Sequence, residues 1–261
     1  MNFKNALLFF GICFAILVPV KIYSAISAIE FVESTTFLVI FGIVAVALGI
    51  GGYFIKTPIK NIAIEKNIIL GVFGALVSAS FFWCISAYFN DTATKYDGEW
   101  QPTLICILSI LSFISFLLFS ISHFCGKNIL SKVPFFIYCP VLWFCVRMSL
   151  FLSMNISHND PYVVITTGLF ALFMVYYTQT FATTTESNNL KILFVFGLPT
   201  ILFSAVTNTP VILNAIFKND FVESALATSV LEIIFAIYIL LTFLEAQKQI
   251  ENHKETVIIS K

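Results

Sequence analysis

The residues of this sequence that could do chemistry are two charged side chains set inside long hydrophobic stretches. Arg147, the only arginine of the chain, lies in the stretch 134–154, and Glu232 lies in the stretch 222–244. A guanidinium keeps its charge at any working pH, and a charge at the centre of a bilayer costs roughly 3 kcal/mol or more. A partner charge or a ligand inside the protein must therefore receive Arg147, which makes these residues the candidate centre of a site.

The depths of the two residues predict that they meet. On helices that rise 1.5 Å per residue, Glu232 lies about 16 Å and Arg147 about 12 Å from the same end of the bundle. Lys21 lies nearer that end, in the stretch 6–28. The expected ligand-binding set is completed by polar and aromatic residues on neighbouring helix faces: Trp143, Ser204, Asn208, Thr228 and Ser229. Trp143 is one turn from Arg147, a spacing that favours a cation–π contact.

Two readings of this set stay open. Two cations against one carboxylate leave a net positive centre, which favours an anionic or zwitterionic ligand such as a carboxylate, a phosphate or a lipid headgroup. Arg147 would bind such a ligand through two donors while Glu232 holds the guanidinium in place. In the other reading, Arg147 and Glu232 form a purely structural ion pair that joins two parts of the bundle.

No catalytic, metal or cofactor motif accompanies these residues. The sequence has no glycine-rich phosphate loop, no HExxH and no GxSxG, and its three histidines are scattered. The six cysteines form no CxxC pair, so they are interpreted as core-facing or lipid-facing residues. The formal net charge is zero, which gives no indication of a nucleic-acid partner. An enzyme is therefore unsupported.

The composition predicts a helical membrane protein that would position these residues. Of 261 residues, 59% are hydrophobic and 11% are charged, whereas soluble domains have about 25% charged residues. Eight apolar stretches can be marked, at 6–28, 36–55, 68–89, 103–125, 134–154, 162–183, 192–208 and 222–244. Stretches of about 20 apolar residues cross a bilayer as helices. The predicted fold class is all-α, a polytopic transmembrane bundle of eight spans.

The distribution of lysines predicts the orientation of the bundle. Most lysines fall in alternate connections and near both termini, whereas the other connections carry mostly acids, with Lys95 and Lys218 as exceptions. Positive residues mark the cytoplasmic side, so both termini are predicted to be cytoplasmic in a cell membrane. The alternative is that the stretch 6–28 is a cleavable signal peptide, which would leave seven helices.

An internal repeat is a further hypothesis. A shift of 126 positions aligns the first four stretches with the last four and places Lys21 on Arg147. The chain would then consist of two parallel four-helix halves, residues 1–126 and 127–246, followed by a polar cytoplasmic tail at 247–261. Pro19, Pro140 and Pro199 lie within stretches and are expected to bend their helices, either as hinges for alternating access or only to shape the packing.

The second half carries a resemblance to known proteins. The pattern P-x-x-W-x-x-x-R of Pro140, Trp143 and Arg147, with Phe196-Gly197-Leu198 and Pro210, resembles an uncharacterised group of multi-span proteins from low-GC Gram-positive bacteria. That resemblance implies a bacterial cytoplasmic membrane and no particular activity. The functional prediction is a transporter or binding component for a small anionic or zwitterionic solute or a lipid headgroup. The alternative is a non-transporting membrane partner or sensor.

Overall fold

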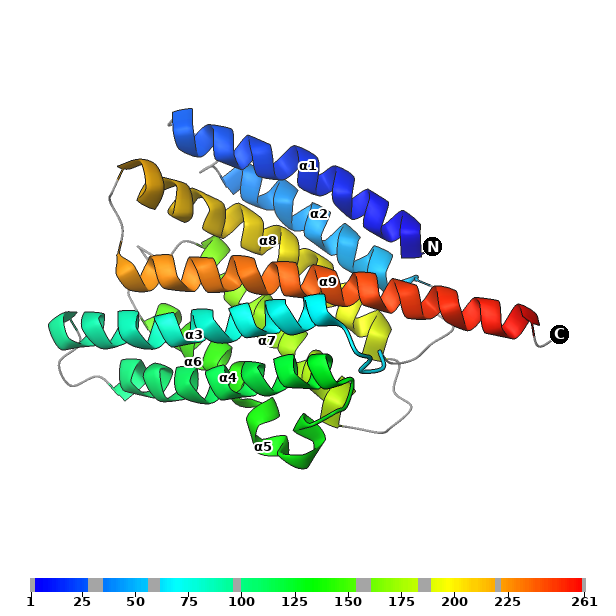
Figure 1. Cartoon of the computed structure of the whole chain (residues 1–261). Coiled ribbons are helices and arrows are strands. Elements are labelled where there is room, and N and C mark those ends of the chain that lie inside the picture. The colour runs from blue at the N-terminus through cyan, green and yellow to red at the C-terminus, as the bar shows by residue number, and fades with distance from the viewer. Residues whose placement is uncertain are drawn as a thin grey trace.

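The structure is a computed structural model that describes residues 3–27, 35–55, 62–95, 100–153, 161–182, 189–218 and 222–259. All regular secondary structure in these ranges is helical (Figure 1). The elements are α1 (Phe3–Ser27), α2 (Thr35–Tyr53), α3 (Ile68–Lys95), α4 (Trp100–Cys125), the 3-10 turn η2 (Leu130–Lys132), α5 (Pro134–Ile137), α6 (Cys139–Ser153), α7 (Pro161–Ala182), α8 (Asn189–Lys218) and α9 (Glu223–Ile259). The predicted all-α fold is confirmed.

Six of the described helices are long and apolar enough to cross a membrane: α1, α3, α4, α7, α8 and α9. Helix α2 and the segment Pro134–Leu150 are also apolar but shorter. These helices indicate a multi-pass membrane protein. The number of eight crossings stays a prediction.

The stretch 134–154 does not form the single continuous helix that was expected. It is divided at Tyr138 into the short α5 and the longer α6. Pro140 has no N–H to donate, and it lies in the first turn of α6, where no intrahelical partner is required. Pro140 therefore starts a helix and does not bend one, in contrast to Pro19, Pro199 and Pro210, which lie inside α1 and α8.

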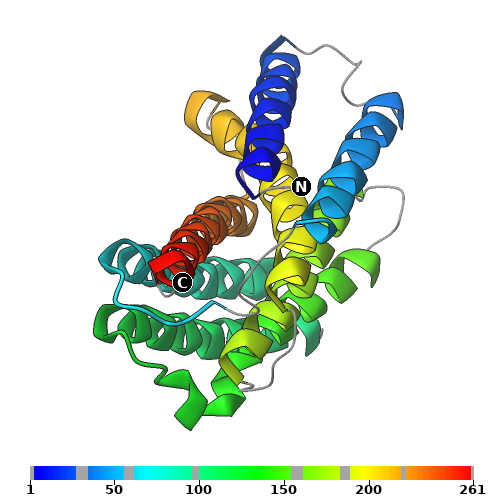
Figure 2. The same cartoon turned by 90° about the vertical axis from the view of Figure 1, so that its right-hand side faces the viewer.

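Six helices form a closed ring. Each packs on its neighbours in the order α8, α9, α3, α4, α6, α7 and back to α8. Helices α1 and α2 lie outside this ring and pack on α8, as Figure 2 shows. Gly52 permits the approach of α2, because a Cβ there would stand 3.0 Å from backbone atoms of Phe194 and Val195.

Aromatic side chains fill the middle of the ring. The rings of Phe144 on α6, Phe170 on α7 and Phe235 on α9 stack in sequence, with centroids 5.1 Å apart at each step. Phe116 on α4 meets Phe235 edge-on at 5.1 Å, and Phe81 on α3 meets Trp143 of α6 at 5.2 Å. Burial of such rings together is a large apolar contribution to stability. This aromatic layer separates the two ends of the ring.

At one end of the ring, residues 62–67 lie beside α4, α7 and α9, near His123, Tyr177 and Glu245; we call this segment the strap. Gln249 of α9 accepts from the backbone N–H of Ala63 at 3.0 Å and donates to its carbonyl at 2.9 Å. Asn67 donates to the carboxylate of Glu245 at 2.7 Å. Lys4 and Glu251 form an exposed ion pair at 3.0 Å, so the start of α1 and the last turns of α9 lie at this same strap end.

Helix α9 continues through Ile259, so the described part of the predicted tail, residues 247–259, extends the helix without a break. Gln249 and Ile250 are buried, which shows that packing on α9 continues past residue 246. The division at residue 126 and the repeat stay predictions. In the described helices the two halves interleave, because α3 and α4 complete a ring with four helices of the second half.

Candidate functional site

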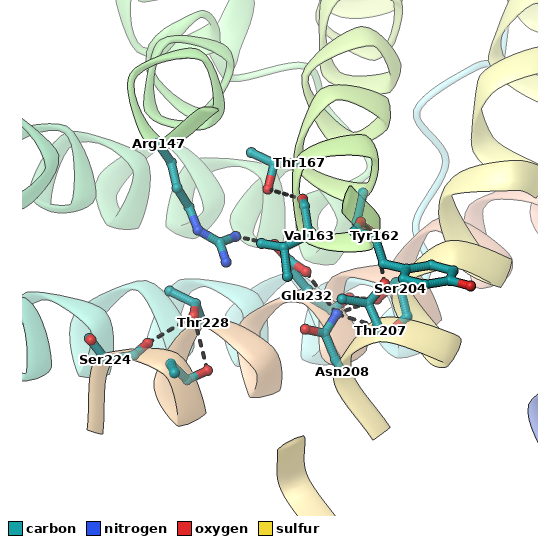
Figure 3. A network of polar contacts seen from close by, with 12 residues as sticks. Arg147, Tyr162, Val163, Thr167, Ser204, Thr207, Asn208, Ser224, Thr228 and Glu232 are labelled. Atoms are coloured by element: carbon teal, nitrogen blue, oxygen red, sulfur yellow. Dashed lines mark hydrogen bonds and ion pairs between the residues drawn. The ribbon is translucent and has the colours of Figure 1, made fainter. Parts of the chain in front are cut away.

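Arg147 and Glu232 form an ion pair across the interior of the ring (Figure 3). The Arg147 Nη1 atom donates to the Glu232 Oε1 atom, and the two side chains are only 4% and 1% exposed. The second carboxylate oxygen, Oε2, accepts from the Asn208 amide at 2.7 Å. Helices α6, α8 and α9 are therefore joined at one carboxylate, and each of its oxygens has a partner.

A second set of contacts fixes the positions of these groups. Ser204 on α8 donates to the backbone carbonyl of Glu232 at 3.0 Å, and the Asn208 amide donates to the carbonyl of Ser204 at 3.0 Å. The guanidinium of Arg147 stands over the indole of Trp143 at 5.5 Å. The indole N–H in turn donates to Ser109 of α4 at 2.7 Å. The expected cation–π contact is confirmed, and Trp143 is itself held by a hydrogen bond.

A cavity of about 200 Å³ lies above the ion pair, at the end of the ring opposite the strap. We call this the cavity end. Its lining comes from five helices and consists of Tyr88, Arg147, Leu150, Val163, Thr207, Asn208, Val211, Ser224, Ala225, Thr228 and Ser229. Arg147 belongs to the lining and Glu232 does not, so an anion in the cavity would contact the guanidinium and not the carboxylate behind it.

The helical repeat explains why these residues converge. Ser224, Thr228 and Glu232 follow one another at four-residue spacing on α9, so they share one face from the rim of the cavity to its floor. Ser204, Asn208 and Val211, at spacings of four and three residues, likewise share one face of α8. The small residues on both faces leave space between the helices, and Arg147 enters it from α6.

The predicted site residues divide into three groups. Arg147, Asn208, Thr228 and Ser229 line the cavity. Glu232, Ser204 and Trp143 lie beneath it and hold the lining residues. Lys21 belongs to neither group, because its Nζ atom stands 4.7 Å from the ring centroid of Tyr162, at the contact between α1 and α7.

The position of Lys21 changes the expected charge of the site. Helix α1 lies outside the ring, which keeps Lys21 away from the lining. The sequence predicted a centre of two cations, Lys21 and Arg147, and one carboxylate. The structure brings together only Arg147 and Glu232, which pair with each other. Among the lining residues that the structure describes, Arg147 carries the only charge.

Sequence reasoning missed several lining residues, of which Tyr88, Thr207 and Ser224 carry hydroxyl groups. Tyr88 is nearly buried on α3 and lies beside Arg147. Thr207 on α8 is 3.0 Å from Thr166 of α7, hydroxyl to hydroxyl. The four-residue spacing of Ser80, Cys84 and Tyr88 marks a face of small and polar residues on α3 that could have indicated Tyr88.

Among the described residues, no three of the His, Cys, Asp and Glu side chains gather as a possible metal site. No protein-family model matches the chain, and no match was found among curated proteins or solved structures. The function has to be inferred from the geometry of the site. That geometry provides one positioned guanidinium, an amide, several hydroxyls and apolar walls around a small cavity, which is a binding arrangement.

Proposed function

We propose that this protein is a component of a cell membrane that binds a small anionic or zwitterionic ligand, a solute or a lipid headgroup, in the cavity above Arg147. The supporting observation is the combination of about 200 Å³ of space with one buried arginine in its lining. Fixing a guanidinium beforehand lowers the entropy lost when an oxyanion binds, and Glu232 and Trp143 fix this one.

The distribution of charge supports an orientation for the cavity. Six lysines belong to segments at the strap end: Lys4, Lys66, Lys127, Lys132, Lys191 and Lys248. The positive-inside rule places this end in the cytoplasm. The cavity would then open toward the outer side of the membrane, and a ligand would enter from there.

Transport is the form of this function that we favour, because α8 carries two prolines around the site. Pro199 and Pro210 flank Ser204 and Asn208. Each proline removes a helix hydrogen bond and gives α8 a position at which it can bend. Bending at Pro199 would shift Ser204 and Asn208 relative to α9 and open the aromatic layer below Glu232.

Cysteine labelling tests whether the cavity is wet. Thr228 lines the cavity, whereas Ser204 lies beneath it and is fully buried. In a background with the six native cysteines replaced by alanine, Thr228→Cys should react with a membrane-impermeant thiol reagent added from outside. Ser204→Cys is the matched control and should stay unlabelled. Equal resistance of both cysteines would contradict a water-accessible cavity.

A second candidate is a non-transporting membrane partner or sensor in which the pair is purely structural. The observation that favours it is the complete pairing of the Glu232 carboxylate, by Arg147 at one oxygen and by Asn208 at the other. This candidate predicts that Arg147→Lys lowers thermal stability and has no separate effect on binding. The proposed function predicts a loss of anion binding that exceeds the loss of stability.

A further inference from the structure

The chemistry of the cavity lining narrows the class of ligand, on the assumption that the proposed function holds. Among the described residues, the lining presents one positive side chain, Arg147, and no acidic one. Glu232 already balances the charge of Arg147, so an added negative charge depends on the guanidinium and the hydroxyl groups of the lining. A doubly charged anion such as phosphate adds two such charges and a monoanion adds one, and the cost of buried charge rises with its amount. The site therefore favours a monoanion over a dianion.

Among the described lining residues, a zwitterion finds no carboxylate to receive its ammonium group. Glu232 lies behind Arg147, and its oxygens already accept from Arg147 and Asn208. The other polar lining groups are hydroxyls, one amide and one guanidinium, which supply no negative charge. Thr228, moreover, donates its hydroxyl to the carbonyls of Ser224 and Ala225 at 2.8 and 3.0 Å. An ammonium group would lose its hydration here without an ionic partner in exchange.

The remaining wall is apolar and comes from different helices. Leu150 of α6, Val163 of α7, Val211 of α8 and Ala225 of α9 all line the cavity. A cavity of about 150 Å³ lined by apolar side chains admits benzene, so a volume of about 200 Å³ accommodates roughly eight non-hydrogen atoms. The lining thus combines one anion-binding end with a short hydrophobic wall.

We propose that the ligand is a monoanion with a short apolar body, of the chemical class of small branched or linear monocarboxylates. Its carboxylate binds Arg147, and its hydrocarbon part packs on Leu150, Val163 and Val211. The same chemistry has two sources, a free short-chain acid from the outer solution or the carboxylate end of a fatty acid in the membrane.

The experiment is a binding titration of the purified full chain in phosphatidylcholine nanodiscs. Binding is measured by the change in tryptophan fluorescence, and the variant Trp143→Phe shows how much of that change comes from Trp143. The probes are acetate, butyrate, isocaproate, leucine and inorganic phosphate. Leucine has the skeleton of isocaproate with an added ammonium group, so this pair isolates the zwitterion. Affinity should rise by about fourfold for each added methylene, from acetate to isocaproate.

Leucine and phosphate should bind at least about tenfold more weakly than isocaproate, because each brings a buried charge that isocaproate lacks. Leucine or phosphate binding as tightly as isocaproate would overturn the monoanion assignment and leave the proposed function standing. If none of the probes binds in a way that Arg147→Lys weakens, both the monoanion assignment and the proposed function are overturned. A competition experiment with palmitate identifies the source of the ligand. If palmitate displaces isocaproate at a concentration below that of isocaproate, the ligand is a fatty acid of the membrane. If palmitate does not displace isocaproate, the ligand is a short-chain acid from solution.

A steric variant checks the position of the apolar body. Val163→Phe reduces the space beside the apolar wall and should weaken isocaproate more than it weakens acetate, with a thermal unfolding measurement to show that the variant is folded. Equal weakening of both acids would contradict the placement of the hydrocarbon part against Val163.

Discussion

The two ends of the six-helix ring both hold polar side chains, yet the cavities that the described residues line there differ greatly in volume. At the strap end, Tyr177 and Tyr238 join hydroxyl to hydroxyl at 2.7 Å, and Tyr238 lies 3.2 Å from His123 Nε2. The space left there, beside His123, Tyr177 and Glu245, is about 10 Å³, the size of a single water molecule. At the cavity end the space is about 200 Å³.

The described contacts at the two ends differ. The strap brings backbone groups to α9, where Gln249 and Glu245 bind it. At the cavity end the described lining hydroxyls come from the helices themselves: Thr228 donates to carbonyls of its own turn, whereas Thr207 pairs with Thr166 of α7. A hydroxyl that pairs within its own turn, as Thr228 does, draws no neighbouring helix against it. Such pairing and the small residues Ser224, Ala225 and Ser229 together leave space between the helices.

The largest effect is expected from removing the negative charge beneath the cavity. Glu232→Gln leaves the buried guanidinium without its counter-charge and should destabilise the protein by about 3–5 kcal/mol. Thermal unfolding of the purified protein in detergent measures this. The double variant Arg147→Met with Glu232→Met removes both charges and should recover most of the lost stability. Equal unfolding temperatures for wild type and Glu232→Gln would show that the pair does not stabilise the ring.

A smaller effect, confined to binding, is expected from Arg147→Lys. Lysine keeps the charge and its pairing with Glu232 but lacks the second terminal nitrogen of arginine. Affinity for isocaproate should fall by about tenfold, equivalent to about 1.4 kcal/mol. A matched change at the strap end, Lys4→Arg, alters the exposed pair with Glu251 and should leave binding unchanged. Identical affinities for wild type and Arg147→Lys would contradict the role of Arg147 in ligand recognition.

The sequence predicted the helices and the depth of the charged pair because both follow from local rules. Apolar length determines the helices, and the rise per residue determines that Arg147 and Glu232 reach one level. Trp143 was found in the same way, since one turn of helix fixes its distance from Arg147. Each of these inferences needs only the position of a residue along its own helix.

Lys21 shows what such rules cannot supply. Its depth was compatible with the site, but α1 packs outside the ring, and helix order around a bundle depends on contacts between distant segments. Tyr88 was missed for a related reason: the polar face of Ser80, Cys84 and Tyr88 is visible along α3, but it does not show which helices that face meets. The break at Tyr138 was also missed, since Pro140 is compatible with both a bent helix and a helix start.

At the strap end, Gln249→Ala should lower stability by about 1 kcal/mol, through the loss of two hydrogen bonds to the exposed backbone of Ala63. Water can replace both bonds, which limits the effect. Affinity for isocaproate should not change, because Gln249 lies beyond the aromatic layer from the cavity. Chemical denaturation and the nanodisc titration measure the two quantities. A loss of affinity in Gln249→Ala would indicate that the strap and the cavity are coupled.

The smallest effect on binding is expected from a matched pair of threonine substitutions on α9, one at each end of the ring. Thr228 and Thr242 are 2% and 3% exposed, and each donates its hydroxyl to the carbonyl four residues before it, at 2.8 and 2.9 Å. Replacement of either by the isosteric valine should change stability by no more than about 0.5 kcal/mol, because the lost bond is local. Thr228 lines the large cavity and Thr242 the water-sized one. To donate to the ligand carboxylate, Thr228 must turn its hydroxyl away from the carbonyls of its own turn, so only the difference between the two bonds is gained. Thr228→Val should therefore weaken isocaproate binding by only about twofold, whereas Thr242→Val should leave it unchanged. If Thr228→Val and Thr242→Val change the affinity for isocaproate equally, the ligand does not bind at the cavity end.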